Sequence, residues 1–392
     1  MSGALGFMTS AAFRVARDVI HGTDDQTLAD MVDATRIPAP LYGETERGRW
    51  FAGRLRETGL QPVIDDVGNV IAVTPSASPD APRIVVASHL DTVFAADTDL
   101  DVRRDGSRLT GPGISDNSRG LAGILALARG LASAGWPTRS PVAFVGTVGE
   151  EGAGDLRGAK HYVATHGGRT GAFIALDGAG ATRVINAGVG SRRLRVTIRG
   201  PGGHSWSDWG APNAVHAAGR TVAALLRLPL PESPRTTLTA ARIGGGTSIN
   251  AIPAEAWFEL DLRSELLEPL ADLEARVRSA VEHAAKAEGR TAGAMTHAID
   301  VIGDRPAGAT RPSDPLVALA VAATEVMGLT PQLASSSTDA NVAMAAGIPA
   351  IAIGGGGDAG GMHTVGEWYD NGGGPSGLER ALVVVLGAAG LA

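Results

Sequence analysis

Apolar residues in the first half of the chain gather in short runs. Residues 84–87, 141–148 and 172–176 are almost continuously apolar and rich in β-branched side chains. Such runs are typical of strands that are buried on both faces in a parallel sheet. Helical periodicity separates them, at residues 121–135 and 156–165. The alternation of buried strands with helices predicts an α/β domain with a mainly parallel sheet.

The flanking segments add further elements to this domain. Their apolar positions repeat with helical spacing, or alternate around turn residues such as Gly and Asn. The expected additions are helices over residues 12–36, 44–59, 314–327 and from Pro375 onward, a hairpin over residues 63–73 and a strand over residues 350–353.

The pattern changes between residues 189 and 303, where charged and apolar residues alternate. Such alternation is typical of strands with one face exposed to water. The predicted elements follow the order strand, helix, strand, strand, helix, strand, which is the ferredoxin-like plan. Their expected bounds are 192–199, 213–226, 236–243, 254–263, 269–288 and 293–301. We therefore predict an inserted α+β domain at residues 189–303, within a first domain made of residues 1–188 and 304–392.

Side chains that can bind metal ions follow the three buried strands, and one more precedes a helix. They are His89, Asp91, Asp116, Glu150, Glu151 and Asp177. Each has an ordinary explanation when taken alone, such as helix capping by Asp116. Two adjacent glutamates, however, repel each other unless a cation or protons offset their charge. Because the carboxyl ends of parallel strands meet at one edge of the sheet, this convergence favours a metal centre.

Composition narrows the chemistry. The chain of 392 residues has no cysteine, so disulfides, thiolate metal sites and a cysteine nucleophile are excluded. Any metal must be held by His, Asp and Glu, which suits zinc, manganese or cobalt. The net charge is −7 and no basic tract occurs, so neither nucleic acid nor an anionic membrane is an expected partner. The first residues lack the pattern of a signal peptide, and we expect a cytoplasmic setting.

Seven segments of the chain, in their order and spacing, resemble the signatures of the M20 family of metallopeptidases. That family includes di- and tripeptidases, carboxypeptidases and aminoacylases. The segments are SHLDTV (88–93), GPGISDNSRG (111–120), GEEGAGDLRG (149–158), ALDGAG (175–180), GPGGHS (200–205), NAIPAEAWFELDLR (250–263) and GMHTVGEW (361–368). The resemblance covers nearly the whole chain. It implies a dinuclear-metal hydrolase domain whose inserted domain is a lid that also forms a homodimer.

The resemblance also implies roles for single residues. Two divalent ions, most simply zinc, would lie about 3.5–4 Å apart and share a carboxylate and a water. Their ligands would be His89 and Asp177 for one ion, Glu151 and His363 for the other, and Asp116 as the bridge. Asp91 would hold His89 in the required tautomer. Glu150 would be the general base that takes a proton from the bridging water.

In the inserted domain, the resemblance implies that His204 stabilises the oxyanion of the tetrahedral intermediate. Asn250 and Arg263 would bind polar groups of the substrate, and a guanidinium suits a carboxylate. An ordinary turn residue and a strand-end arginine are the alternatives for these two. Gly149 stands where many relatives have an aspartate before the paired glutamates, so the subgroup and its substrate stay open.

The favoured function is metal-dependent hydrolysis of amide bonds in short peptides. An N-acyl amino acid amidohydrolase is the main alternative, and an N-carbamoyl amide hydrolase fits less well. A non-catalytic binding module on the same fold is a third class, against which the complete ligand set and Glu150 argue. The hydroxyl-rich segment at residues 335–343 is a further candidate for lining the pocket, through its part Ser335–Asp339.

Overall fold

The computed structural model describes residues 5–289 and 295–392. The chain divides into two compact units. Unit 1 comprises Met1–Gly188 and Ala309–Ala392, and unit 2 comprises Val189–Gly308. Among the described residues, no helix is both long enough and apolar enough to cross a membrane.

Unit 1 is built on a mainly parallel sheet, which confirms the predicted fold class. The central strand β3 pairs in parallel with β6 on one side and β7 on the other, and β7 pairs in parallel with β17. Within the described residues the strand order is β1 (Val63–Ile64), β2 (Val70–Val73), β6 (Val142–Thr147), β3 (Arg83–His89), β7 (Thr170–Leu176), β17 (Ala350–Ile353), β8 (Arg183–Gly188) and β15 (Gly308–Ala309), with β16 (Gln332–Ser336) paired to β8.

Helices cover both faces of this sheet, which is why apolar side chains point to both faces of its central strands. On β3, Ile84 and Val86 point into one core and Val85 and Ala87 into the other. The first core is closed by α1 (Ala11–Gly22), α3 (Thr45–Glu57), α4 (Ser118–Ser133), α8 (Pro315–Val326) and α10 (Gly374–Ala389); the second is closed by α5 (Arg157–His166) and α9 (Ala340–Ala345). Each fully buried Val or Ile contributes about 1.5–3 kcal/mol.

The single helix expected over residues 12–36 is wrong, because the segment forms two helices. The first, α1, is capped by the Ser10 hydroxyl, which accepts the Phe13 N–H, and it ends at Gly22, with Thr23 as its C-cap. The second, α2, covers Asp24–Arg36 and packs on α4. Asp24 and Asp25 occupy its first turn, where the positive end of the helix dipole favours acidic side chains. The apolar residues keep their helical spacing on both sides of Thr23, so the sequence pattern does not reveal where α1 ends and α2 begins.

A small antiparallel sheet, absent from the sequence prediction, joins two loops of unit 1. Its strands are β18 (Asp358–Gly360), β19 (Trp368–Asp370), β5 (Arg108–Thr110) and β4 (Arg103–Asp105), in that order. Trp368 pairs with Thr110 across β19 and β5. The sheet therefore ties the segment after residue 360 to the segment that leads into residues 111–117.

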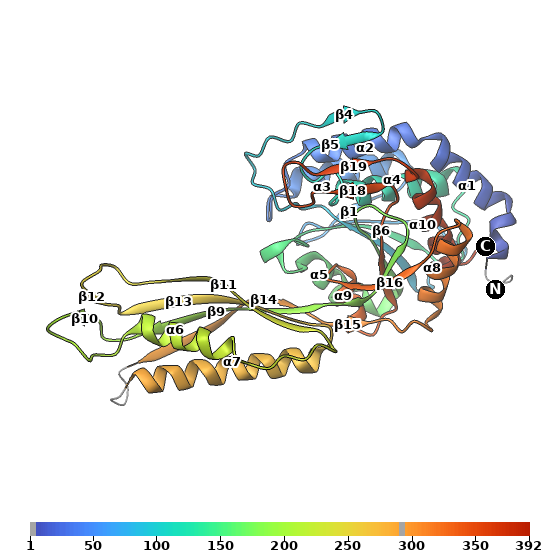
Figure 1. Cartoon of the computed structure of the whole chain (residues 1–392). Helices are drawn as coiled ribbons and strands as arrows, with labels where there is room; N and C mark the ends of the chain where they lie inside the picture. Colours follow the sequence, from blue (N-terminus) through green and yellow to red (C-terminus); the bar gives the residue numbers. More distant parts are fainter. Residues whose placement is uncertain (1–4, 290–294) are drawn as a thin grey trace. The chain divides into compact units, whose positions relative to one another are not determined.

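Unit 2 has the predicted ferredoxin-like plan. Its sheet order is β11 (Thr236–Gly245), β13 (Glu255–Ser264), β9 (Gly190–Arg199) and β14 (Thr296–Arg305). Helices α6 (Ala214–Leu225) and α7 (Leu267–Glu288) pack side by side on one face of this sheet (Figure 1). The other face is polar, with cross-strand ion pairs such as Arg195 to Glu259 at 2.6 Å. The last strand was expected from residue 293, and residues 293–294 lie outside the described ranges.

Candidate metal centre

The carboxyl ends of three neighbouring strands in unit 1 deliver acidic and imidazole side chains to one place. His89 is the last residue of β3, and Asp177 directly follows β7. The Glu150–Glu151 pair follows β6, separated from it by a short turn. Asp116 precedes α4, and His363 lies between β18 and β19. The sheet thus brings together five residues that the sequence analysis proposed as ligands.

Asp116 lies at the middle of this group and uses its two oxygens differently. Its Oδ1 is 3.0 Å from Nε2 of His89, and its Oδ2 is 3.2 Å from Nε2 of His363. Nε2 of His89 also lies 3.9 Å from Oδ1 of Asp177, and Nε2 of His363 lies 3.1 Å from Oε1 of Glu151. One carboxylate therefore faces two separate sets of donor atoms.

These donor atoms form two groups that share Asp116. One group is His89, Asp116 and Asp177, and the other is Asp116, Glu151 and His363; the donor atoms within each lie within 4.8 Å of one another. Carboxylate oxygens and imidazole nitrogens suit zinc, manganese and cobalt. Two groups joined by one carboxylate are the donor set that a pair of divalent cations requires, so the residues fit such a pair.

The carboxylates carry an electrostatic cost that a cation would relieve. Burial, followed by the negative charge of Asp116, raises the pKa of Asp177 to about 7. The same two causes, in the same order, raise the pKa of Glu151. Buried acids that resist ionisation in this way need a positive partner in order to carry their charge at neutral pH. A cation bound here would therefore favour the ionised form of both acids.

The pKa values of the two imidazoles are also raised, and for these rings a raised pKa favours the charged form. The hydrogen bond to Asp116 raises the pKa of His363 to about 9, although partial burial opposes the shift. For His89, burial lowers the pKa, but the hydrogen bond to Asp116 and the charges of Asp116 and Asp91 outweigh it, so the pKa is raised well above its usual value. The Asp116 pKa is lowered, because these hydrogen bonds exceed the effect of its burial.

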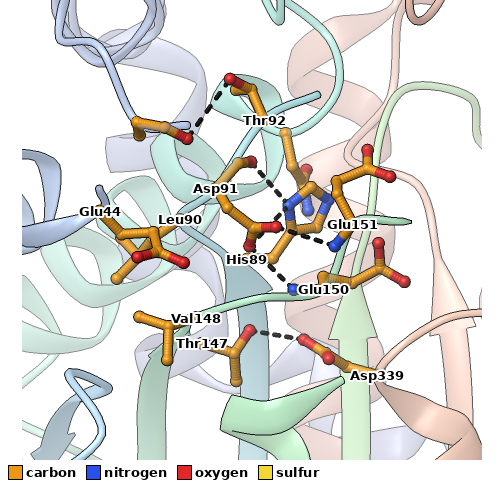
Figure 2. A network of polar contacts seen from close by, with 12 residues as sticks. Glu44, His89, Leu90, Asp91, Thr92, Thr147, Val148, Glu150, Glu151 and Asp339 are labelled. Atoms are coloured by element: carbon orange, nitrogen blue, oxygen red, sulfur yellow. Dashed lines mark hydrogen bonds and ion pairs between the residues drawn. The ribbon is translucent and has the colours of Figure 1, made fainter. Parts of the chain in front are cut away.

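The carboxylate of Asp91 accepts hydrogen bonds from backbone N–H groups next to the site (Figure 2). Its Oδ1 accepts the Glu150 N–H at 2.9 Å, and its Oδ2 accepts the Glu151 N–H at 2.8 Å. The Nδ1–H of His89 donates to the backbone carbonyl of Asp91 at 3.0 Å, whereas the Asp91 carboxylate lies 3.8 Å away. Because the Asp91 carbonyl binds Nδ1, the other ring nitrogen of His89, Nε2, faces Asp116. The side chain of Asp91 instead fixes the turn that carries the two glutamates.

Asn117 holds the loop of Asp116 against β7. Its Oδ1 accepts the N–H groups of Gly120 and Gly178, and its Nδ2 donates to the carbonyl of Leu176 at 3.2 Å. Asn117 is therefore the N-cap of α4, and Asp116 is left to face the imidazoles. Gly120 permits this close contact, since a Cβ there would lie 2.3 Å from the Leu176 carbonyl oxygen.

His363 has a backbone conformation that is unusual for its residue type. Its φ is +64°, in the left-handed region that non-glycine residues seldom adopt. Such strain clusters at functional sites, where the surroundings hold a side chain in place. The side chain is 53% exposed, more than those of the other four proposed ligands. His363 is thus the most solvent-accessible member of the group.

Asp339, from the hydroxyl-rich segment, borders this region at the end of β6. It is buried and accepts a hydrogen bond from the Thr147 hydroxyl (Figure 2). Its negative charge is one of the smaller causes that raise the pKa of Asp177. Ser335 and Ser336 belong to β16 instead. The acidic end of the segment therefore acts on the electrostatics of the site.

The three other proposed residues belong to unit 2. His204 lies in β10 (Gly203–His204), paired with β12 (Ala251–Ile252), and its Nδ1 accepts the Trp206 N–H at 3.2 Å. The proton of the neutral ring is thereby assigned to Nε2, which is left as a donor. Asn250 is exposed, and its carbonyl accepts the Ser205 N–H. Arg263 donates to Asp261 at 2.8 Å.

Two curated relatives share part of the sequence. A putative succinyl-diaminopimelate desuccinylase, DapE, of Mycobacterium tuberculosis is 28% identical over 246 residues, which cover 60% of this chain and 65% of that protein. A putative [LysW]-lysine/[LysW]-ornithine hydrolase of Pyrococcus abyssi is 31% identical over 128 residues, covering 33% and 34%. The match thus spans about two thirds and one third of the length of these relatives.

Solved structures share the fold over nearly the whole chain. The aminopeptidase PepT of Bacillus cereus superposes with a TM-score of 0.76 at 22% identity, covering 93% of this chain and 99% of that one. The YXEP protein of Bacillus subtilis, described as a dinuclear metal binding peptidase of the M20 family, has a TM-score of 0.70 at 16% identity and covers 94% and 99%. At these identities the likeness concerns the fold.

The family follows from the sequence itself. The model of peptidase family M20/M25/M40 matches residues 85–389, which include every proposed metal ligand. This match confirms the resemblance inferred from the seven segments. Dinuclear metal binding is typical of the family, and the two donor groups around Asp116 agree with it. The chain belongs to the peptidase family M20/M25/M40.

Proposed function

We propose that this protein is a metal-dependent hydrolase that cleaves amide bonds of short peptides. The observation that carries the proposal is the orientation of the Asp116 carboxylate, whose Oδ1 faces His89 while its Oδ2 faces His363. A carboxylate placed in this way is suited to bridge two cations. His89 and Asp177 would hold one ion, and Glu151 and His363 the other. When bound, two divalent ions would polarise the scissile carbonyl and make a water molecule acidic at neutral pH.

Glu150 is the residue best placed to move protons. Its side chain is buried, and its backbone N–H is fixed by Asp91 at 2.9 Å. Its carboxylate oxygen lies within 4.8 Å of donor atoms of His89 and Glu151. In this role a Glu150 oxygen accepts a proton from the attacking water and later delivers it to the leaving amide nitrogen. The C–N bond then breaks, and a carboxylate and an amine are released.

Four finer features belong to the same proposal. The native ions are zinc, with manganese or cobalt as substitutes. Unit 2 serves as a lid over the substrate and forms a homodimer. His204 donates from Nε2 to the developing oxyanion, a role supported by the Trp206 N–H that occupies its Nδ1. Asn250 and Arg263 bind polar groups of the substrate.

A second candidate is hydrolysis of N-acyl amino acids. The similarity to the putative desuccinylase DapE favours it, because that name describes removal of an acyl group from an amine. Both candidates use the same chemistry, since a peptide bond and an N-acyl bond are both amides. They differ in the groups that flank the bond.

The test is a panel of dipeptides, tripeptides and N-acyl amino acids, assayed after chelation and again after adding Mn²⁺, Co²⁺ or Zn²⁺. We expect amine release that vanishes on chelation, returns with metal and is fastest for short peptides. Faster cleavage of N-acyl amino acids would select the second candidate. Absence of hydrolysis with every metal, together with a Glu150→Gln variant that behaves as the wild type, would overturn both.

A further inference from the structure

Glu367 lies in the segment that follows His363, and its carboxylate is fully buried. The oxygens accept three backbone N–H groups from one loop. Oε1 accepts those of Ser115 and Asp116, both at 2.8 Å, and Oε2 accepts that of Gly113 at 3.1 Å. In the described part of the chain, each hydrogen bond that this carboxylate accepts comes from that loop. The carboxyl group of Glu367 is therefore held by the backbone of the loop that carries Asp116.

The backbone of Glu367 joins the same two loops. Its carbonyl accepts the Gly111 N–H at 2.9 Å, and its own N–H donates to the carbonyl of Thr364 at 3.1 Å. Thr364 directly follows His363. The contacts therefore run from the loop of Asp116, through Glu367, to the loop of His363. These loops are about 250 residues apart in sequence, since the contact between Asp116 and Glu367 spans 251 positions.

The contacts of Glu367 resemble those that Asp91 makes with the backbone of the two glutamates. The Asp91 carboxylate accepts the N–H groups of Glu150 and Glu151, whereas the Glu367 carboxylate accepts those of Ser115 and Asp116. In each case a buried carboxylate fixes the backbone of a proposed ligand and does not itself belong to either donor group around Asp116.

We propose that Glu367 is a positioning residue for the metal centre, fixing Asp116 so that its two oxygens face the two donor groups. This inference rests on the proposed function only in that Asp116 bridges two ions. Because Asp116 belongs to both groups, release of its backbone weakens binding of both ions. The ion held by Glu151 and His363 is affected more, since Glu367 also fixes the loop of His363.

Two variants probe this role. Glu367→Gln keeps one carbonyl oxygen for Ser115 and Asp116 but turns an NH₂ group towards the Gly113 N–H. Glu367→Ala removes every acceptor and leaves three buried N–H groups unpaired. We expect the affinity for Mn²⁺ to fall about tenfold in the first variant and about a hundredfold in the second, the range seen when groups supporting metal ligands are changed.

Asp30 supplies the matched control. Its carboxylate is also fully buried in unit 1, but it accepts hydrogen bonds from Arg54 and Arg129, both at 2.6 Å, and within the described residues it has no hydrogen bond or ion pair with a proposed ligand. Asp30→Asn therefore lowers thermal stability without moving Asp116. Comparison with this variant separates a loss of metal affinity from a general loss of stability.

The measurement is calorimetric titration of chelated protein with Mn²⁺, with electron paramagnetic resonance of the loaded protein as a second readout. We expect wild type and Asp30→Asn to bind two ions that give the signal of a coupled pair. Glu367→Gln should bind more weakly and lose that signal. If wild type binds two ions and Glu367→Gln gives the same isotherm and spectrum, the positioning role is overturned while the proposed function stands. If wild type binds fewer than two, the proposed function fails first.

Discussion

Asp91 fixes the backbone of Glu150, since its Oδ1 accepts the Glu150 N–H at 2.9 Å. The other oxygen, Oδ2, accepts the Glu151 N–H, so both oxygens are used within one turn. A proposed base and a proposed ligand are thereby held by a single carboxylate. Adjacent side chains of an extended segment point in different directions. Fixing this backbone therefore also fixes which glutamate side chain faces which group of the site.

Replacing Asp91 with asparagine should lower kcat by about ten- to a hundredfold, with a smaller effect on KM. The amide keeps one oxygen but turns an NH₂ group towards the second N–H, so the turn is released on one side. Steady-state kinetics of Asp91→Asn measure this, with Asp30→Asn as the control for altered stability. An unchanged kcat would show that the turn is rigid without Asp91.

The two glutamates should separate in their effect on metal content. Glu150→Gln should bind two ions but lose about 10²–10⁴-fold in kcat, the usual contribution of a general base. Glu151→Gln should lose an ion, because Glu151 belongs to the donor group with Asp116 and His363. Elemental analysis of both purified variants decides the matter. Equal metal loss in both would mean that the roles have been assigned wrongly.

Ion binding should release protons, and the affinity should fall as the pH is lowered. The His363 pKa is raised to about 9 by its hydrogen bond to Asp116, and that of His89 is raised as well. The His363 ring is therefore protonated at neutral pH in chelated protein, and the raised His89 pKa acts in the same direction, whereas an imidazole must be neutral to bind a metal. Protons thus compete with the ions below about pH 9. Calorimetry in buffers of different ionisation enthalpy counts them, and a heat independent of buffer would contradict this.

The active site is expected to be shared between two subunits, with His204 acting on the partner's metal centre. Inactive His204→Ala and Glu150→Ala proteins, mixed under conditions of subunit exchange, should then regain about a quarter of wild-type activity. Half of the random dimers are mixed, and half of their sites contain both intact residues. Exchange is verified with differently tagged subunits. A mixture that exchanges but stays inactive would place His204 at the site of its own chain.

Several features of the site follow from the sequence because their cause is local. An apolar run that ends in His89 or in the Glu150–Glu151 pair predicts both a buried strand and a polar group at its end. Once the strands are parallel, these groups must meet at one edge. The ferredoxin-like plan of unit 2 is likewise carried by alternation along its strands, which burial in β13 follows residue by residue.

Other features have causes that no local pattern contains. Glu367 is one acid between a glycine and a tryptophan, and its partners are backbone N–H groups far away in the sequence. The backbone contacts of Asp91 and the two oxygens of Asp116 depend in the same way on how loops meet in space. Asn117 did carry a signal, because an asparagine directly before an apolar helix is typical of an N-cap.

The position of β17 in the central sheet has a consequence for the order of assembly during synthesis. This strand lies between β7 and β8, and β8 neighbours β17, β15 and β16. All three follow the four-stranded sheet of unit 2 in the chain, so β8 leaves the ribosome with no strand to join. Unit 2 can form its own core during that interval, as its sheet and helices are contiguous in sequence. Vectorial folding would then complete the insert first, and the metal centre would assemble after it.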